Sequence, residues 1–148
     1  MGFLNFWQEE KSSYEEQASQ LDLSGNSQQL TSRRKRVDGA IVNRRFNKAI
    51  SDNGGDEEAH RQSAIAETDE LFGCSVRELY QATGGKRGDR STLPQPAQEA
   101  YMVNESLTAH ELERMVGTIG GEDQDEVNGR IVGMVRQEAK KTRFRLPW

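Results

Sequence analysis

The stretch Glu78–Glu105, ELYQATGGKRGDRSTLPQPAQEAYMVNE, predicts two helices joined by an exposed hinge. Its middle, Gly84–Arg90, contains three glycines and four charged residues, and such a composition cannot build a core. Ser75 and Glu78 match the S-x-x-E capping pattern that typically begins a helix, here just before the hinge. Beyond the hinge, Pro96 suits the first turn of another helix, because the N–H that proline lacks would be unpaired there. We therefore expect segment 83–92 to face solvent or a partner.

Apolar residues recur at helical spacing along the rest of the chain, and the alternation typical of strands is absent. Acidic residues fill the expected first turns at 56–58 and 125–126, where the helix macrodipole favours negative charge. Helices are expected over about residues 3–21, 28–50, 56–72, 75–82, 96–116 and 123–143. The sequence predicts an all-α fold, a small irregular bundle of five or six helices with loosely packed, mobile ends.

The composition limits the number of domains and the class of protein. Of 148 residues, 33% are hydrophobic and 30% are charged, which is enough for one domain with a modest core. The formal net charge is −4. Cys74 is the single cysteine, so an internal disulfide is excluded. No apolar run approaches the roughly 18 residues that span a bilayer, and the first residues lack the features of a signal peptide. The expected location is cytoplasmic.

Three parts follow from this pattern, namely residues 1–26, 27–121 and 122–148. The first is an amphipathic helix whose aromatic stripe would either pack on the chain's own core or anchor a partner. The second is the helical core with the hinge at 83–92. The third combines an amphipathic helix with a basic and aromatic tail. The candidate partner-docking residues are Phe3, Phe6, Trp7, Phe144 and Trp148.

Basic residues are concentrated in segment 32–48, which carries seven of them against a single acid, Asp38. On a helix they can form a broad face that binds phosphates by releasing counterions. The alternative is pairing with acidic segments of the same chain, such as 56–70 or 122–126. The tail 136–145 adds five basic residues and could extend the patch. The candidate phosphate or nucleic-acid contacts are Arg33, Arg34, Lys35, Arg36, Arg44, Arg45, Lys48, Lys86, Arg87 and Arg90.

No motif of catalytic chemistry is complete. Glycine N–H groups of the hinge TGGKRG could line an anion, but Arg87 stands where a P-loop needs Ser or Thr. His110 begins like the zinc motif H-E-x-x-H, yet Arg114 replaces its second histidine. Cys74 precedes a helix start, where a thiolate would be stabilised, but it has no adjacent base. We predict no catalytic residue, no cofactor, no metal and therefore no enzyme.

The hinge and its flanks also carry a resemblance. The residues concerned are Glu78-Leu79-Tyr80, Thr83-Gly84-Gly85, Arg90-Ser91-Thr92-Leu93-Pro94, Ala97-Gln98 and Glu105. Segment 78–105 resembles one found downstream of the DNA-binding module in prophage antirepressor and DNA-damage-inducible proteins, the Bro and KilA-N group. The resemblance implies a regulatory, non-enzymatic protein of a mobile element. That group's DNA-binding module contains β-strands, which residues 1–70 do not predict, so none of its functional residues is assigned here.

Taken together, these patterns predict a regulatory or adaptor protein that acts by helix-mediated binding to another protein. Nucleic-acid binding through the basic 33–48 helix and the C-terminal tail is the first alternative. A structural accessory subunit of a larger assembly is the second.

Overall fold

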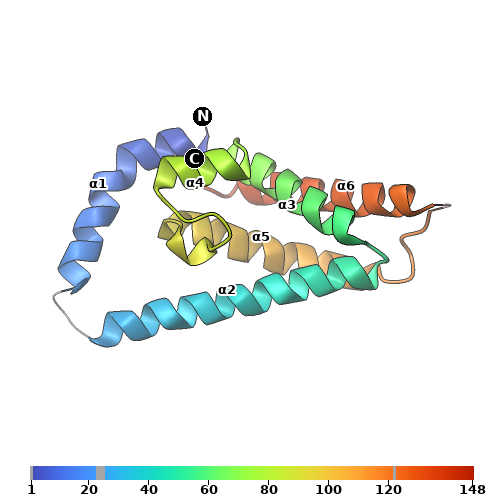
Figure 1. Cartoon of the computed structure of the whole chain (residues 1–148), viewed down its shortest axis with the longest axis horizontal. Coiled ribbons are helices and arrows are strands. Elements are labelled where there is room, and N and C mark those ends of the chain that lie inside the picture. The colour runs from blue at the N-terminus through green and yellow to red at the C-terminus, as the bar shows by residue number, and fades with distance from the viewer. Residues whose placement is uncertain (1, 23–25, 122) are drawn as a thin grey trace.

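The protein is helical throughout the residues that its computed structural model describes (Figure 1). These are residues 2–22, 26–121 and 123–148, without the side chains of 14–37. Six α-helices and one short 3-10 helix occur in them, and no strand does. The helices are α1 (Phe3–Asp22), α2 (Asn26–Asp52), α3 (Glu57–Phe72), α4 (Val76–Thr83), η1 (Arg90–Thr92), α5 (Gln95–Arg114) and α6 (Gln124–Arg143). The prediction of an all-α fold is confirmed.

Side-chain caps explain where three of these helices begin. The side chain of Asp56 accepts a hydrogen bond from Ala59 N at the start of α3, and the side chain of Ser75 accepts one from Glu78 N at the start of α4. Asp123 does the same for Glu126 N in front of α6. Each cap satisfies a backbone donor that has no partner within the helix.

The bundle is built from two pairs of helices. α2 packs beside α5, and α3 packs beside α6 (Figure 1). The α2–α5 pair is parallel, since Asn43 bonds to Glu105 near one end while Asn53 bonds to the carbonyl of Leu112 further along both helices. α3 and α6 are also parallel to each other, and both run opposite to α2 and α5 (Figure 1). The two ends of the chain lie close together beside α4.

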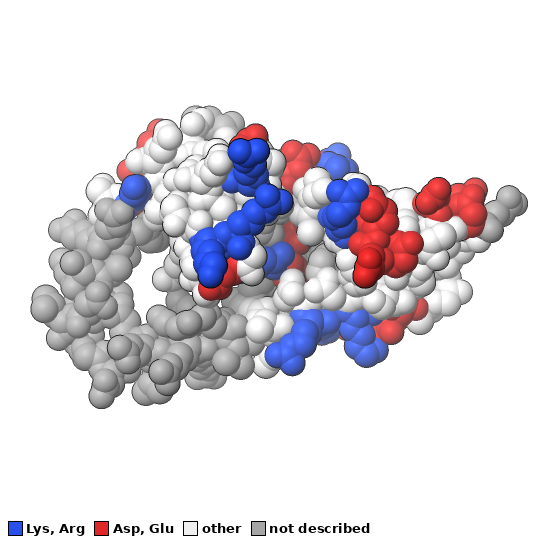
Figure 2. Space-filling view, in the orientation of Figure 1, with Lys and Arg blue, Asp and Glu red and all other residues white. Residues whose placement is uncertain are grey.

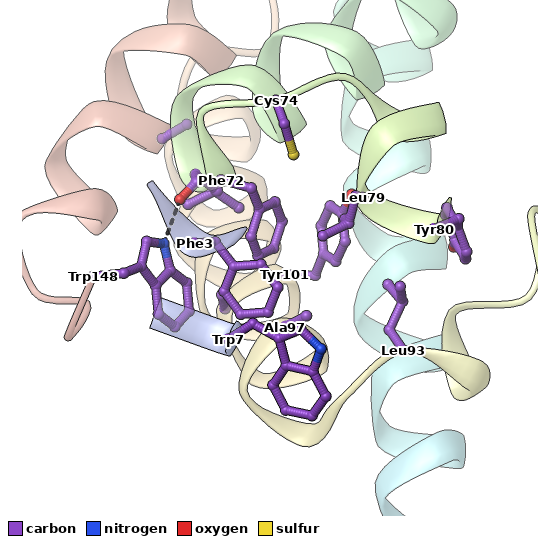
Figure 3. Packing of buried hydrophobic residues seen from close by; sticks show 13 residues of the cluster. Phe3, Trp7, Phe72, Cys74, Leu79, Tyr80, Leu93, Ala97, Tyr101 and Trp148 are labelled. Atoms are coloured by element: carbon purple, nitrogen blue, oxygen red, sulfur yellow. Dashed lines mark hydrogen bonds between the residues drawn. The ribbon is translucent and has the colours of Figure 1, made fainter. Parts of the chain in front are cut away.

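One of two apolar clusters brings both chain ends together (Figure 3). We call it the aromatic cluster, and its buried rings are Phe3, Trp7, Phe72, Tyr80, Tyr101 and Trp148. The ring centroids of Phe3 and Trp148 are 4.8 Å apart, and those of Phe3 and Phe72 are 5.1 Å apart. Trp148 Nε1 donates a hydrogen bond of 2.7 Å to the carbonyl of Leu71. The tail is thereby fixed to the end of α3.

Burial of these rings corrects one premise of the sequence interpretation. Phe3 is 0% exposed, and Trp7 and Trp148 are each 8% exposed, so none of the three presents its ring to a partner. Phe6 is half-buried against the same cluster. The amphipathic stripe therefore serves the chain's own core, because the ends of α3 and α5 offer apolar surface close to both termini.

The second apolar cluster lies at the other end of the bundle. α2 contributes Phe46 and Ile50, α5 contributes Leu112, and α6 contributes Ile131 and Val135. All five side chains are at most 3% exposed. Between the two clusters, α3 and α5 each bury several polar side chains, and these form the candidate site described below.

We predict that the Trp148→Ala substitution lowers the free energy of unfolding by about 3–5 kcal/mol, the usual range for emptying a large aromatic site. Chemical denaturation followed by circular dichroism measures this change. The matched control is Phe144→Ala in the same tail, whose ring is 90% exposed and whose loss should change stability by about 0.5 kcal/mol at most. Equal effects of the two substitutions would contradict the docking of Trp148.

Candidate functional site

A polar layer crosses the middle of the bundle between the two apolar clusters. It is formed by buried side chains of α3 and α5, each at most 1% exposed. The members are Ser63, Glu67, Thr68, Asn104, Glu105 and Thr108. Burying charged groups is unfavourable unless they are paired and hydrogen-bonded, so each carboxyl in this layer requires partners.

Arg90 of η1 supplies the positive charge. Its Nη1 lies 2.7 Å from both carboxylate oxygens of Glu105, and its Nη2 lies 3.8 Å from Oε2 of Glu67. The guanidinium also stacks over the ring of Tyr101, with Cζ 3.9 Å from the ring centroid. Arg90 thus joins the segment after α4 to the interior of the bundle. The expectation that Arg90 stands free as a phosphate contact is wrong, because its charge is directed inward to two buried carboxyls.

Neutral side chains from the other helices complete the network. Asn43 of α2 donates from Nδ2 to the Glu105 carboxylate at 3.2 and 3.3 Å. Asn104 donates to Oε1 of Glu67 at 3.0 Å and accepts from Thr142 of α6 at 2.9 Å. The hydroxyls of Thr68 and Tyr101 are 2.7 Å apart. No local sequence pattern predicts this network, because its members come from five separate elements.

Burial and charge shift the titration of these groups. Burial, together with the nearby charge of Glu105, raises the pKa of Glu67 well above its usual range. Burial alone would lower the pKa of Arg90, but the charges of Glu105 and Glu67 more than offset this and raise it above its ordinary value. Burial likewise raises the pKa of Tyr101. Arg90 therefore stays charged, and Tyr101 stays neutral, at physiological pH.

The segment expected to be a hinge is an ordered turn. We call residues 84–89 the basic turn. Its Lys86 N donates to Thr92 Oγ1 at 2.8 Å, and the Asp89 side chain caps η1 by accepting from Ser91 N. A Cβ atom at Gly85 would come within 3.0 Å of Thr92 and Tyr80, so only glycine fits there without displacing a neighbour. The basic turn is therefore held on both sides by specific contacts.

Several of the predicted surface cations are paired within the chain. Arg45 lies 2.6 Å from Glu113 of α5, and Lys48 lies 2.6 Å from Asp52 one turn along α2. Pairing with segments 56–70 or 122–126 was the alternative given for this face, and the acids that pair with Arg45 and Lys48 lie outside those segments. Arg136 in the C-terminal part does pair with α3, at 3.2 Å from Asp69 and 2.8 Å from Glu70. Ion pairs of this exposed kind contribute little to stability.

Other cations have no acidic partner among the described residues. They include Arg44 on α2, Arg77 on α4, and Lys86 and Arg87 in the basic turn, and these four are exposed. Figure 2 shows basic side chains gathered over α4 and the turn that follows it, with others along α2. Arg77 was missed by the sequence analysis, since no charge run surrounds it. The predicted contacts Arg33, Arg34, Lys35 and Arg36 lie outside the described side chains.

Phe144 is the candidate docking residue that does stand free. Its ring is 90% exposed, whereas the other predicted docking aromatics are buried or half-buried. The residue follows α6 directly and lies between two arginines, Arg143 and Arg145. Large exposed aromatic side chains next to positive charge are typical of contact surfaces.

Groups considered for nucleophilic or metal chemistry are dispersed. Cys74 is buried, and burial raises the pKa of its thiol to about 11, aided by the charges of Glu78 and Asp69. The helix start therefore does not stabilise a thiolate, and the thiol stays protonated at neutral pH. Across residues 2–13 and 38–148, with 122 left aside, no three His, Cys, Asp or Glu side chains converge as a metal site would require. The two carboxyls of the polar layer are engaged by Arg90, Asn43 and Asn104.

Comparisons with protein-family models, with curated proteins and with solved structures found no match for this chain. In the described part of the chain, none of the helices combines the length and the apolar character needed to traverse a membrane.

We predict that Arg90→Met lowers the free energy of unfolding by about 3–5 kcal/mol, because it leaves buried carboxyls without their cation. Arg90→Lys should recover only part of the loss, since an ammonium lacks the planar group that stacks over Tyr101. Denaturant titration gives both values. The matched control is Arg136→Met, which removes an exposed pair and should lower stability by about 1 kcal/mol or less. Similar losses for Arg90→Met and Arg136→Met would contradict the importance of the polar layer.

Proposed function

We propose that the protein is a regulatory or adaptor protein that works by binding another protein, with Phe144 as an anchor. The observation that carries the proposal is the 90% exposure of this ring at the end of α6. The aromatics at both chain ends were expected to dock a partner, and burial of Phe3, Trp7 and Trp148 leaves Phe144 as the aromatic candidate that is well exposed.

The surroundings of Phe144 favour a partner with an acidic rim around an apolar pocket. Arg145 is exposed next to it, and Lys140 and Lys141 precede it within the last turn of α6. Aromatic residues with neighbouring cations recur among the residues that dominate binding energy at interfaces. The proposed surface also lies on a tail that Trp148 fixes to α3, so the ring is presented in a defined position.

The resemblance of segment 78–105 to prophage antirepressor and DNA-damage-inducible proteins supports a regulatory role and a mobile-element origin as parts of this proposal. In those residues the structure shows an ordered turn between two helices, held by Arg90. The proposed mode of action is therefore binding through surfaces held rigid by the bundle.

A specific observation favours nucleic-acid binding as a second candidate function. Arg77, Lys86 and Arg87 are exposed cations without an acidic partner in the described residues, and Arg44 adds a fourth on α2. Phosphate groups would neutralise them and release counterions. The acids Glu78 and Asp89 lie near this surface and reduce its net charge, so we rank this function second.

The protein-binding proposal predicts that Phe144→Ala abolishes recovery of a partner in affinity capture from the source cell. The ring contributes little to folding, so the thermal midpoint should stay within a few degrees of the unchanged protein. The control is Ile65→Ala, which removes an apolar side chain, 43% exposed, from the face of α3. Recovery of the same proteins by Phe144→Ala and Ile65→Ala would refute Phe144 as the anchor.

The nucleic-acid proposal predicts that affinity for duplex or single strands falls steeply with salt. The triple variant Arg77→Ala, Lys86→Ala and Arg87→Ala should flatten the plot of log affinity against log salt by about 0.9 per lost contact on duplex DNA. A control of equal charge change is Arg61→Ala, Arg114→Ala and Lys141→Ala, whose cations each pair with an acid three residues away. Absence of binding at low salt, or equal slopes for both variants, removes this candidate.

A further inference from the structure

One buried carboxyl oxygen of the polar layer lacks a hydrogen-bond partner among the described residues. Oε2 of Glu67 is fully buried and has no conventional hydrogen-bond donor among the described residues. Its closest cation, Arg90, is 3.8 Å away at Nη2. A carboxylate oxygen in this position would be strongly destabilised, because it has given up water without gaining a donor.

A proton placed between Glu67 and the neighbouring carboxyl of Glu105 removes this destabilisation. Glu67 and Glu105 face the same guanidinium, since Nη2 of Arg90 lies 3.8 Å from Oε2 of Glu67 and its Nη1 lies 2.7 Å from both oxygens of Glu105. Two ionised carboxylates only accept hydrogen bonds, so a bond between them exists only when one of them carries a proton. Like charges placed this closely in a buried site do not ionise together, and one of the two carboxyls retains its proton.

The net charge of the polar layer also indicates that one of its two carboxyls is protonated. Arg90 provides one positive charge, and two ionised carboxyls would leave the layer with a net negative charge. The groups that face the pair from other elements are neutral: Asn43 from α2, Thr142 from α6, and Tyr101 from α5. Tyr80 of α4 is also an uncharged neighbour of this region, near Arg90 and Tyr101. A single proton makes the whole layer electrically neutral.

The hydrogen bonds decide which carboxyl holds the proton. Glu105 receives Nη1 of Arg90 on both oxygens and Nδ2 of Asn43 in addition. Among the described residues, Glu67 receives a donor from Asn104 alone, at Oε1. Donors stabilise the ionised form, so Glu67 is the carboxyl that carries the proton.

We propose that Glu67 is protonated at neutral pH and donates its proton from Oε2 to Glu105, and that this shared proton locks Arg90 and the basic turn onto α3 and α5. Loss of the proton adds a second buried negative charge, which favours entry of water. Arg90 keeps contact with solvent, its side chain being 35% exposed, whereas the two carboxyls are at most 1% exposed. The basic turn is therefore the segment that loosens first when the proton leaves.

The direction of the pH dependence follows from Glu67. Its pKa is higher in the folded protein than in the unfolded chain, so its contribution to stability is complete at acidic pH. That contribution is lost as the pH rises through the folded-state pKa of Glu67. The attachment of Arg90 and the basic turn to α3 and α5 is therefore strongest at acidic pH and weakens as the pH rises.

Infrared spectroscopy tests the protonation state directly. The full-length protein at neutral pH should show the C=O stretch of a protonated carboxyl, although its exposed acids are ionised. Glu67→Gln, which keeps the shape and a donor, should lose this band completely. The matched control is Glu70→Gln, which removes a carboxyl of the same helix that pairs with Arg136, and it should keep the band.

Two outcomes overturn the proposal: no protonated-carboxyl band in the unchanged protein, or a band that survives Glu67→Gln. Should Glu67→Gln fail to fold by circular dichroism, the unchanged protein still decides, because the band must vanish in one step as the pH rises above the normal range of glutamate.

Hydrogen exchange tests the link to the basic turn. The amides of Lys86, Asp89, Thr92 and Leu93 are hydrogen-bonded within this segment and serve as probes. Their protection factors should fall with rising pH in the unchanged protein and stay constant in Glu67→Gln. Amides of Val135 and Ala139 in α6 provide the internal reference. Identical pH dependence of the probes in the two proteins would show that the proton does not control the turn.

Discussion

The ion pair between Arg90 and Glu105 joins the segment after α4 to the middle of α5. Glu105 is buried in α5, and the cation that neutralises it comes from η1, fifteen residues earlier in the chain. This contact determines how the chain returns from α4 to α5, and thereby where the basic turn is placed. Glu67 and Tyr101 lie against the same guanidinium, and Asn43 bonds to the Glu105 carboxylate paired with it, so α2, α3 and α5 meet at one ion pair. A buried charge accepts few alternative positions, because each of them would leave it without a partner.

The polar layer also separates two apolar clusters with different characters. The aromatic cluster gathers both ends of the chain around Phe72, whereas the other cluster is built mainly from aliphatic residues of α2, α5 and α6. Apolar side chains alone permit helices to slide by a turn, but the layer requires Asn104 to meet both Glu67 and Thr142. The hydroxyls of Ser63 and Thr108 lie in the same layer without a partner among the described residues. We infer that the layer contributes more to the uniqueness of the fold than to its stability.

Local signals predicted the helices well, and long-range chemistry explains what they missed. Ser75 acts through a neighbour three residues away, so the start of α4 could be read directly from the chain, whereas Asp56, expected in the first turn of α3, is its N-cap. Arg90 was expected at the surface because glycines and charges surround it, yet its partners are fifteen and more residues distant. An amphipathic aromatic stripe looks the same whether it packs on its own chain or on another, which is why the sequence left Phe3 and Trp7 as candidates for either role. The exposure of Phe144 agrees with the sequence interpretation, while its role stays a prediction.

The parallel arrangement of α2 and α5 has a consequence for how quickly the molecule can form. Neighbouring helices joined by a short loop usually run antiparallel and find each other early, but here the contacts from Asn43 and Arg45 reach 62 and 68 residues ahead. α3 and α6 are similarly remote, with Arg136 bonded to a residue 66 positions away. Closing such large loops precedes the gain from packing, and chains dominated by remote contacts reach the native state more slowly. We therefore expect this bundle to fold more slowly than hairpin-type helical bundles of equal size, with helix formation well ahead of final assembly.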